Sequence, residues 1–350
     1  MKIVVLAGGL SPERNVSLSS GTKITQALRD LGHRSAMVDM YFGLEDYPDL
    51  TGEELYAAEL PQAWKKVVRV APDLAAVKAS RHWTGKGDFG PGVLELCQDA
   101  DIVFLALHGQ CGEDGRVQAA FDLMGIPYTG SGYLGSAIAM DKDMTKKLVK
   151  ELVDTPSWSF AEYTADDVDR LTSKTEVPCV VKPVDSGSSI GVSIAFDKKQ
   201  LHQALLEGLN FGGRCVLERY VSGREIQVGV LDGKALPAIE IIPISGFYDY
   251  ENKYQPGAAR EICPADLTQA QIDKVSKAAV AVYSALDLGV YSRVDFILDE
   301  NDVAWFLEIN TLPGMTPTSL MPQEAAAAGI NYPALCQHII DSSLRQRRKS

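Results

Sequence analysis

The clearest alternation of apolar and polar residues lies near the carboxyl end of the chain. Its period of two predicts a β-hairpin whose turn is centred on residues 301 and 302. Antiparallel pairing then places Asp295 opposite Glu308 and Arg293 opposite Asn310. Residues two apart share a strand face, so these four polar side chains are predicted to converge. The other face is apolar throughout and is predicted to be core: Val294, Phe296, Leu298, Trp305, Leu307 and Ile309.

The polar face of this hairpin is a candidate metal site. Two carboxylates and an amide oxygen form an incomplete set of hard ligands, which suits Mg²⁺ completed by water and substrate phosphates. The following stretch contains Pro313 and Gly314, which end the strand and allow backbone N–H groups to lie beside the metal. The hairpin therefore predicts a nucleotide site, and a hairpin with a merely solvated polar face is the alternative.

The beginning of the chain has the pattern of an α/β domain. The apolar run Lys2 to Ala7 predicts a strand, two glycines a turn, and the stretch from about Ser17 to Leu31 a helix. The turn has neither the dinucleotide fingerprint nor a Walker A loop. It carries Glu13 at the carboxyl end of the strand, where open α/β sheets bind ligands. A charge that merely stabilises a helix N-terminus is the equal alternative for Glu13.

The pattern weakens over residues 41–92, which we interpret as a peripheral insertion of short helices and loops. It returns with a predicted helix at Gly92 to Cys97 and a strand at Asp101 to Leu107. His108 then opens a glycine-rich loop that also contains Glu113. Both side chains are predicted to face the same sheet edge as Glu13, although a lone histidine is more often structural.

The middle of the chain predicts a helix and a loop that could bind phosphate. Leu134 to Leu152 predicts one amphipathic helix, whose lysines on such a face are usually solvated. Two β-rich runs, Cys179 to Lys182 and Gly191 to Phe196, flank the small-residue loop Pro183 to Ile190. Small residues let backbone N–H groups approach phosphate oxygens. With Lys182 at its base, this loop is predicted to be a phosphate flap, and an ordinary loop between strands is the alternative.

Further strands are predicted at Arg214 to Tyr220, Arg224 to Leu231 and Lys234 to Ile244. Their polar residues could contact a nucleoside, but spacing alone does not settle this. The stretch Ser245 to Pro264 is a long loop with three tyrosines, which predicts an ordered lid. A long helix is predicted at Leu267 to Leu288, and residues 344–350 are interpreted as a solvated end.

Composition narrows the function classes. The chain has 350 residues, enough for two or three domains. Lys plus Arg is 34 and Asp plus Glu is 46, so the net charge of -12 argues against a nucleic-acid surface. No apolar run approaches the ~20 residues of a membrane helix, and no secretory signal is visible. Six scattered cysteines indicate neither zinc nor disulfides, which predicts a cytoplasmic protein.

Seven stretches resemble the D-alanine–D-alanine ligases of the ATP-grasp superfamily. They occur in the family's order and span its three domains, and FYDYENKY and EINTLPGMTPTSL are specific to the ligases. The flap sequence Val184-Asp185-Ser186 and the longer insertion depart from the family and put peripheral contacts in doubt. The matching stretches are Gly9 to Ser17, Leu107 to Gly115, Ile126 to Ser136, Met140 to Lys142, Lys182 to Gly191, Phe247 to Tyr254 and Arg293 to Leu320.

The resemblance implies a mixed α/β and α+β fold with the three-domain ATP-grasp architecture. Residues 1–130 would form an N-terminal α/β substrate domain with a parallel sheet and the insertion at about 41–92. Residues 131–217 would form the central domain with the flap at 183–190. Residues 218–350 would form the C-terminal domain with the lid loop at 245–264.

The resemblance also implies how ATP is held. Asp295, Glu308 and Asn310 would bind two Mg²⁺ ions, with Mn²⁺ as an alternative. The remaining nucleotide contacts would come from residues near the flap, the lid and the strands between them. Lys142 and Lys182 would hold phosphates with Lys253 nearby, Glu218 and Val221 would border adenine, and Glu225 would bind ribose.

The amino-acid substrates are assigned in the same way. Glu13 would bind the ammonium of the first D-alanine and His108 would lie near its carboxylate. Ser188 and Tyr254 would link Glu13 to the lid by hydrogen bonds. Arg293 and the N–H of Gly314 would form an oxyanion hole, and Ser319 with the N–H of Leu320 would receive the second carboxylate.

The implied activity is ATP-dependent joining of two D-alanines through a D-alanyl phosphate, for peptidoglycan precursors, by a homodimer. A relative that takes D-lactate or D-serine as second substrate is the nearest alternative, and Tyr254 favours the dipeptide. A nucleotide-binding regulatory protein without chemistry is opposed by the intact hairpin residues. A dinucleotide oxidoreductase is opposed by the missing glycine fingerprint.

Overall fold

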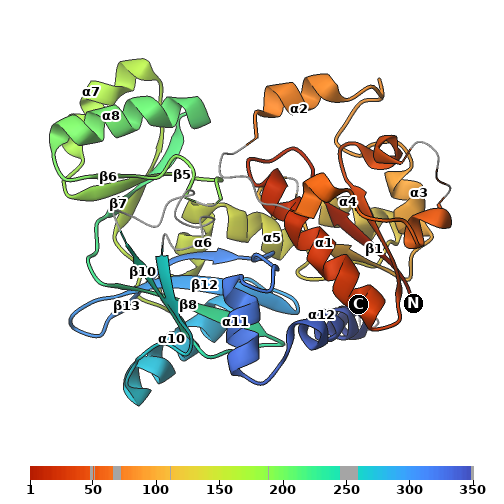
Figure 1. The fold of residues 1–350 in the computed structure, drawn as a ribbon. Coiled ribbons are helices and arrows are strands. Elements are labelled where there is room, and N and C mark those ends of the chain that lie inside the picture. Colours follow the sequence, from red (N-terminus) through yellow and green to blue (C-terminus); the bar gives the residue numbers. More distant parts are fainter. Residues whose placement is uncertain are drawn as a thin grey trace.

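The computed structural model describes residues 1–47, 50, 52–65, 72–110, 112–187, 189–244 and 259–347. It contains a parallel three-stranded sheet, a four-stranded antiparallel sheet and a six-stranded antiparallel sheet (Figure 1). Helices cover the outer sides of the two antiparallel sheets, α7 and α8 on one and α10 on the other (Figure 1). The fold is therefore mixed α/β with a parallel N-terminal sheet, as predicted.

The parallel sheet places β1 (Lys2–Ala7) between β2 (Arg34–Asp39) and β3 (Ile102–Leu105). Most residues of its strands are apolar and buried, because both faces of the sheet are covered. The helix α1 (Arg14–Asp30) begins three residues earlier than predicted, with Glu13 at the N-cap position. The other helices of this region are α3 (Val93–Gln98) and α4 (Arg116–Met124), with short helices η1 (Gly43–Asp46), η2 (Glu54–Tyr56), η3 (Gln62–Lys65) and α2 (Leu74–Ser80) in the insertion.

The small antiparallel sheet has the strand order β4-β7-β5-β6. Val181 and Leu217 on its strands form a core of their own with Leu205, which lies on the helix α8 over the sheet. Its elements are β4 (Trp158–Glu162), η4 (Ala165–Asp167), α7 (Val168–Lys174), β5 (Cys179–Pro183), β6 (Ser193–Ala195), α8 (Lys198–Gly208), η5 (Leu209–Phe211) and β7 (Arg214–Arg219).

The large antiparallel sheet has the strand order β11-β10-β8-β12-β13, with β9 paired to β8. One face packs on α10, and Val228, Val294 and Phe296 are fully buried there. Two C-terminal helices follow, and α12 packs against α1 of the first region. The elements are β8 (Arg224–Leu231), β9 (Lys234–Ala235), β10 (Ile239–Pro243), β11 (Ala259–Ile262), α10 (Gln269–Ala285), β12 (Tyr291–Leu298), β13 (Ala304–Asn310), α11 (Leu320–Ala327) and α12 (Tyr332–Arg347).

The hairpin β12–β13 confirms the predicted pairs and corrects one of its faces. Arg293 pairs with Asn310 and Asp295 with Glu308, but a bulge then shifts the register so that Phe296 lies opposite Phe306. The bulge reverses the facing of the residues before Glu308. Phe306 is therefore in the core, whereas the predicted core residues Trp305 and Leu307 are only half-buried.

The predicted helix over residues 134–152 is two helices, α5 (Tyr133–Met140) and α6 (Lys142–Val149). Asp141 between them has an extended backbone, and its Oδ1 accepts a hydrogen bond of 2.9 Å from Met144 N–H. An N-cap of this kind starts a helix and excludes one continuous element. The break also places Lys142 at the start of α6, where its N–H donates to the Val184 carbonyl at 3.0 Å.

Three smaller predictions were also wrong. The strand predicted over residues 234–244 is divided into β9 and β10, because Pro237 lies between them and cannot donate to a ladder. The predicted loop over residues 245–264 ends in the strand β11, and residues 245–258 lie outside the described part. Residues 344–347 belong to α12 rather than to a solvated end, and Arg347 Nε donates to the Tyr128 carbonyl at 2.7 Å.

Within the described ranges, no helix combines the length and the apolar character needed to cross a bilayer.

Candidate active site

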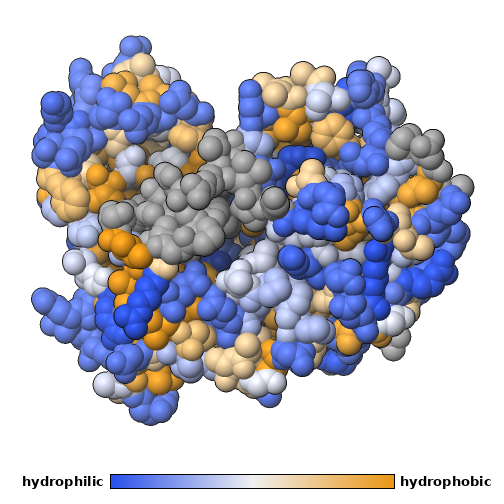
Figure 2. All heavy atoms as spheres, in the orientation of Figure 1, coloured by the Kyte–Doolittle hydropathy of each residue, from blue (hydrophilic) through white to orange (hydrophobic). Residues whose placement is uncertain are grey.

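A cavity of about 460 Å³ lies between the small and the large antiparallel sheets. Its apolar wall includes Val180, Ile194, Ile241 and Ile297, two from each sheet. On the face shown in Figure 2, apolar surface is visible in the region of β10, near whose end lie the exposed Ile242 and Ile244, and much of the rest of that face is hydrophilic. Seven of the predicted nucleotide and metal residues line this cavity: Lys142, Lys182, Glu218, Val221, Glu225, Asp295 and Glu308.

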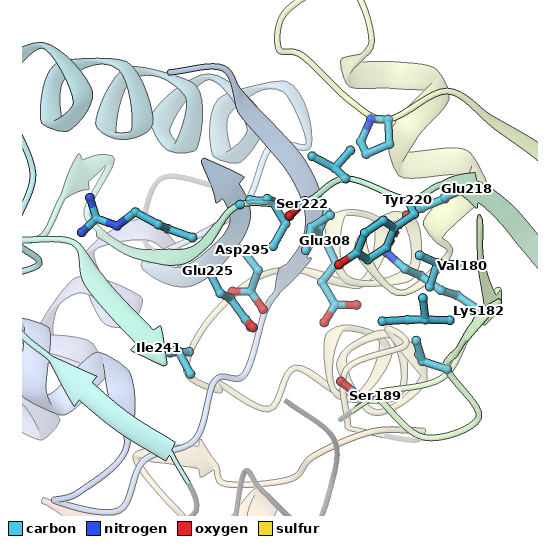
Figure 3. A pocket seen from close by; sticks show the side chains of 18 of the residues that line it. Val180, Lys182, Ser189, Glu218, Tyr220, Ser222, Glu225, Ile241, Asp295 and Glu308 are labelled. Carbon is cyan, nitrogen blue, oxygen red and sulfur yellow. Dashed lines mark ion pairs between the residues drawn. The ribbon is translucent and has the colours of Figure 1, made fainter. Parts of the chain in front are cut away.

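One end of the cavity contains a buried carboxylate between two lysines. Glu218 Oε2 lies 2.6 Å from Lys182 Nζ, and its Oε1 lies 2.9 Å from Lys146 Nζ. Figure 3 shows Lys182 and Glu218 at the same end as Val180 and Tyr220. Burial alone would raise the pKa of Glu218, but the charges of Lys182 and Lys146 outweigh burial and the net pKa is lowered. Glu218 is therefore a charged acceptor beside the apolar wall.

The opposite end is formed by the hairpin. Arg293 Nε and Nη2 donate to the two carboxylate oxygens of Asp295 at 2.8 and 2.9 Å, which is a bidentate pair. Asn310 Nδ2 lies 3.3 Å from Asp295 Oδ2. Lys142 Nζ lies 3.4 Å from Glu308 Oε2 and donates to the Ser186 carbonyl at 2.6 Å. The predicted convergence of the four hairpin side chains is present, and Lys142 joins them to the flap.

The oxygens at this end suit a hard cation. Figure 3 shows the carboxylates of Asp295, Glu308 and Glu225 directed into the cavity. Among the described residues, no group of three His, Cys, Asp or Glu side chains forms a complete metal cluster. A divalent ion here would therefore need the Asn310 amide oxygen and substrate oxygens beside the carboxylates. This donor set is the one that Mg²⁺ commonly accepts.

The edge of the parallel sheet meets the hairpin next to this cavity. Glu13 is buried, and a Cβ added to Gly187 would lie 2.8 Å from its Oε2, so the flap backbone approaches it closely. His108 Nδ1 lies 2.9 Å from the Leu312 carbonyl. Burial lowers the pKa of His108, which favours the neutral imidazole. Glu13 and His108 thus lie near one junction, as predicted for the ends of neighbouring strands.

Glu113 ties two loops together at the same junction. It accepts hydrogen bonds from Gly109 N–H at 2.8 Å and from Leu312 N–H at 3.2 Å. Burial and the charge of Glu13 raise the pKa of Glu113 to about 8. The sequence indicated that Glu113 faces this edge but assigned it no role. The structure shows that it holds the loop after β3 against the loop after β13.

The loop after β13 ends at the N-terminus of α11. Ser319 is the N-cap residue, and its Oγ accepts a hydrogen bond of 3.0 Å from Thr316 N–H. A Cβ added to Gly314 would lie 3.0 Å from Ser319 Oγ, so the loop is closely folded on itself. Leu320 begins the helix and packs against Ile239 and Ile241. The N–H groups at such a helix start favour an anion.

Some predicted site residues cannot be placed, and one was missed. Ser188, Lys253 and Tyr254 lie outside the described residues. Lys146 was not predicted, although it is fully buried and pairs with Glu218. Its position four residues after Lys142 was a usable signal, because such residues share a helix face.

The sequence has counterparts in known proteins. Residues 2–131 match the family described as D-ala D-ala ligase N-terminus, and residues 153–341 match D-ala D-ala ligase C-terminus. The D-alanine--D-alanine ligase of Pediococcus pentosaceus is 42% identical over 97% of both chains. That of Lacticaseibacillus casei is 39% identical over 99% of this chain and 96% of its own.

Solved structures agree in fold. A Bacillus anthracis D-alanine--D-alanine ligase complexed with ATP has a TM-score of 0.74 and 31% identity, and covers 100% of this chain and 99% of its own. The VanG D-Ala:D-Ser ligase of Enterococcus faecalis also has a TM-score of 0.74, at 25% identity, over 98% of this chain and 99% of its own.

Proposed function

The chain belongs to the D-alanine–D-alanine ligase family, and on that premise we propose how the residues around its cavity carry out the reaction. The ATP-grasp fold expected from the sequence is confirmed by the related structures. The activity is ATP-dependent joining of two D-alanines through a D-alanyl phosphate, in the synthesis of peptidoglycan precursors. The roles of individual residues are the proposal.

ATP lies in the cavity of about 460 Å³ between the two antiparallel sheets. Adenine occupies the end with Glu218 and Val221, because a charged acceptor beside an apolar wall suits the amino edge of a flat base. The ribose lies near Glu225, and Lys182 and Lys142 hold the phosphates. The position of Lys142 supports this role, since Lys142 lies between the flap carbonyl of Ser186 and the hairpin carboxylate of Glu308.

Asp295, Glu308 and Asn310 would hold Mg²⁺, as two ions according to the family resemblance. When bound, the metal would neutralise phosphate charge during transfer. The bidentate pair with Arg293 fixes the plane of the Asp295 carboxylate before any ion arrives. Lys142 places a further positive charge beside Glu308, where the transferred phosphate would lie.

The first D-alanine lies at the junction near Glu13. Its ammonium pairs with Glu13, and a neutral His108 lies near its carboxylate. A carboxylate oxygen of this substrate attacks the γ-phosphorus of ATP, and the bond to ADP breaks. The resulting acyl phosphate has a good leaving group, which the free carboxylate lacked.

The second D-alanine binds where Ser319 and the N–H of Leu320 receive its carboxylate at the start of α11. Its amine attacks the carbonyl carbon and loses a proton, and phosphate leaves. The negative charge on the carbonyl oxygen develops against Arg293 and the N–H of Gly314. A fixed donor is effective there because it needs no reorganisation as the charge forms. Ser188, Lys253 and Tyr254 keep the roles that the family resemblance implies, outside the described residues.

The observation that carries this proposal is the gathering of Lys142, Lys182, Glu218, Asp295 and Glu308 around one cavity. It is tested by phosphate release from ATP and Mg²⁺ with D-alanine, L-alanine, or D-alanine plus D-lactate or D-serine, with each product identified by mass. We expect release that depends on D-alanine, with D-alanyl-D-alanine as product. ATP binding without release would instead favour a regulatory protein, and a mixed product would shift the choice of second substrate.

We also propose a homodimer, supported by exposed apolar residues on the helices α4, α5 and α6. Helix α5 contacts both α4 and α6. Leu123 is 91% exposed and Leu148 is 49% exposed. Apolar side chains gathered on adjacent helices favour a protein interface. We expect Leu148→Glu to produce monomers in sedimentation velocity, whereas Lys150→Glu at the C-cap of the same helix leaves the dimer intact. A parent protein that sediments as a monomer at all concentrations would contradict this.

Two further proposals concern organisation and location. The separate sheets support a division into three domains, proposed at 1–130, 131–217 and 218–350. The bound after residue 217 falls inside β7 (Arg214–Arg219), so the small sheet itself extends to residue 219. Limited proteolysis that does not cut near either of the two domain junctions would contradict the division. The cytoplasmic location is supported by free cysteines at positions 97, 179, 215, 263 and 336. Cell fractionation that recovers the protein outside the cytoplasm would overturn it.

A further inference from the structure

Lys146 is a buried charge behind the adenine end of the cavity. It lies on α6 one helical turn after Lys142, and its side chain has no exposed surface. Lys182 and Glu218 are among the described residues that line the cavity, and Lys146 is not. A buried charge is costly unless it is paired, so its pairing requires an explanation.

The Lys146 ammonium is held by groups from several elements. Its Nζ lies 2.9 Å from Glu218 Oε1 on β7 and donates to Thr155 Oγ1 at 2.8 Å. The Phe306 carbonyl on β13 lies 3.5 Å away. The rings of Trp158 and Phe306 have their centroids 5.7 Å from Nζ, within the range of a cation–π contact. These contacts fix the ammonium beside Glu218 at a fully buried position outside the described lining of the cavity.

Glu218 therefore has two lysine partners of different kinds. Lys182 pairs with Oε2 at 2.6 Å and also lines the cavity, where it is proposed to hold phosphate. Once a nucleotide binds, the positive charge of Lys182 is shared between Glu218 and the phosphates. Lys146 is enclosed and does not line the cavity, so its pairing with Glu218 is independent of what the cavity binds. The second lysine thus keeps a counter-charge on the carboxylate when the first one is engaged.

We propose that Lys146 is a positioning residue that holds Glu218 as a carboxylate aimed at the 6-amino group of adenine, and so sets the preference for ATP. This inference rests on the proposed function, in which Glu218 borders adenine. A carboxylate only accepts hydrogen bonds, so it pairs with a 6-amino group and is repelled by a 6-oxo group. A site built around such an acceptor rejects the wrong base strongly.

The test is Lys146→Met, assayed with ATP and with inosine triphosphate at saturating D-alanine. We expect the KM for ATP to rise about tenfold or more while kcat changes little, because the variant weakens a charged hydrogen bond to the base. The preference for ATP over inosine triphosphate, as the ratio of kcat/KM values, falls by about tenfold as well. Lys147→Met is the matched control, since the Lys147 side chain is 57% exposed and pairs with Asp143, and it leaves both quantities unchanged.

A variant that simply folds poorly is distinguishable. Loss of folded protein lowers kcat in proportion and leaves KM and the nucleotide preference at the parent values, which would overturn the role of Lys146. Thr155→Val provides a milder test, because it keeps the lysine and removes only the hydroxyl that anchors it. We expect it to change KM and the preference in the same direction as Lys146→Met, by a smaller factor.

Glu218→Gln separates the proposed adenine contact from the proposed role of Lys146. If Glu218→Gln leaves the nucleotide preference unchanged, the proposed adenine contact is wrong and the role of Lys146 falls with it. If Glu218→Gln removes the preference while Lys146→Met retains it, the adenine contact stands and only the role of Lys146 is wrong. Loss of preference in both variants supports both.

Discussion

Arg293→Ala is expected to lower kcat at least a hundredfold. The guanidinium is fixed by its bidentate pair with Asp295, at 2.8 and 2.9 Å, before any substrate binds. A preorganised donor at a developing oxyanion is typically worth about 2.7 to 4 kcal/mol, which corresponds to a factor of about a hundred to a thousand. Single-turnover measurement of dipeptide formation at saturating ATP, Mg²⁺ and D-alanine checks this.

The variant also leaves the buried Asp295 without its arginine, so its folded fraction must be measured in parallel. Arg293→Lys keeps the charge but loses the two-pronged geometry, and it should lie between parent and alanine variant. Arg345→Ala is the matched control, because that side chain is 62% exposed and pairs with Asp232 on the surface. Near-native turnover of folded Arg293→Ala would remove Arg293 from the oxyanion hole.

Glu308→Gln is the second large effect. The variant replaces a carboxylate opposite Asp295, 3.4 Å from Lys142 Nζ, with a neutral amide of almost the same shape. Loss of groups that only support a metal ligand commonly costs 10- to 100-fold, so loss of a ligand charge should cost about a hundredfold or more in kcat. The Mg²⁺ concentration for half-maximal rate should rise as well.

The measurement is a Mg²⁺ titration of D-alanine-dependent phosphate release. Glu300→Gln is the control, because Glu300 is exposed at the turn of the same hairpin and should titrate like the parent. A Glu308→Gln enzyme with lower turnover but an unchanged Mg²⁺ requirement would place Glu308 near the phosphates without making it a metal ligand.

The residues that could be found from the sequence are those whose position follows from local strand geometry. Asp295 and Glu308 face one another because a hairpin fixes which residues are opposed. The bulge before Glu308 could not be foreseen, since alternation alone does not reveal one additional residue in a strand. Trp305 and Leu307 were assigned to the wrong face for that reason. The predicted helix over residues 134–152 runs through Asp141, although the side chain of Asp141 caps α6.

The partners that the sequence could not supply are those formed between distant segments. Lys146 resembles any lysine on an amphipathic helix until β7 places Glu218 2.9 Å away. The role of Glu113 in joining two loops likewise depends on Leu312, almost two hundred residues later, whose N–H donates to it. Both are buried ionisable side chains in contact between elements, and hydrophobic periodicity carries no information about such pairs.

The central claim is that ATP in this cavity activates the carboxylate of the first D-alanine. It is tested most directly by running the reaction with D-alanine labelled with ¹⁸O in its carboxylate and analysing the released phosphate by mass. An acyl phosphate requires one labelled oxygen to pass from the amino acid to each phosphate. We predict that transfer, together with formation of D-alanyl-D-alanine. Dipeptide accompanied by unlabelled phosphate would contradict the account.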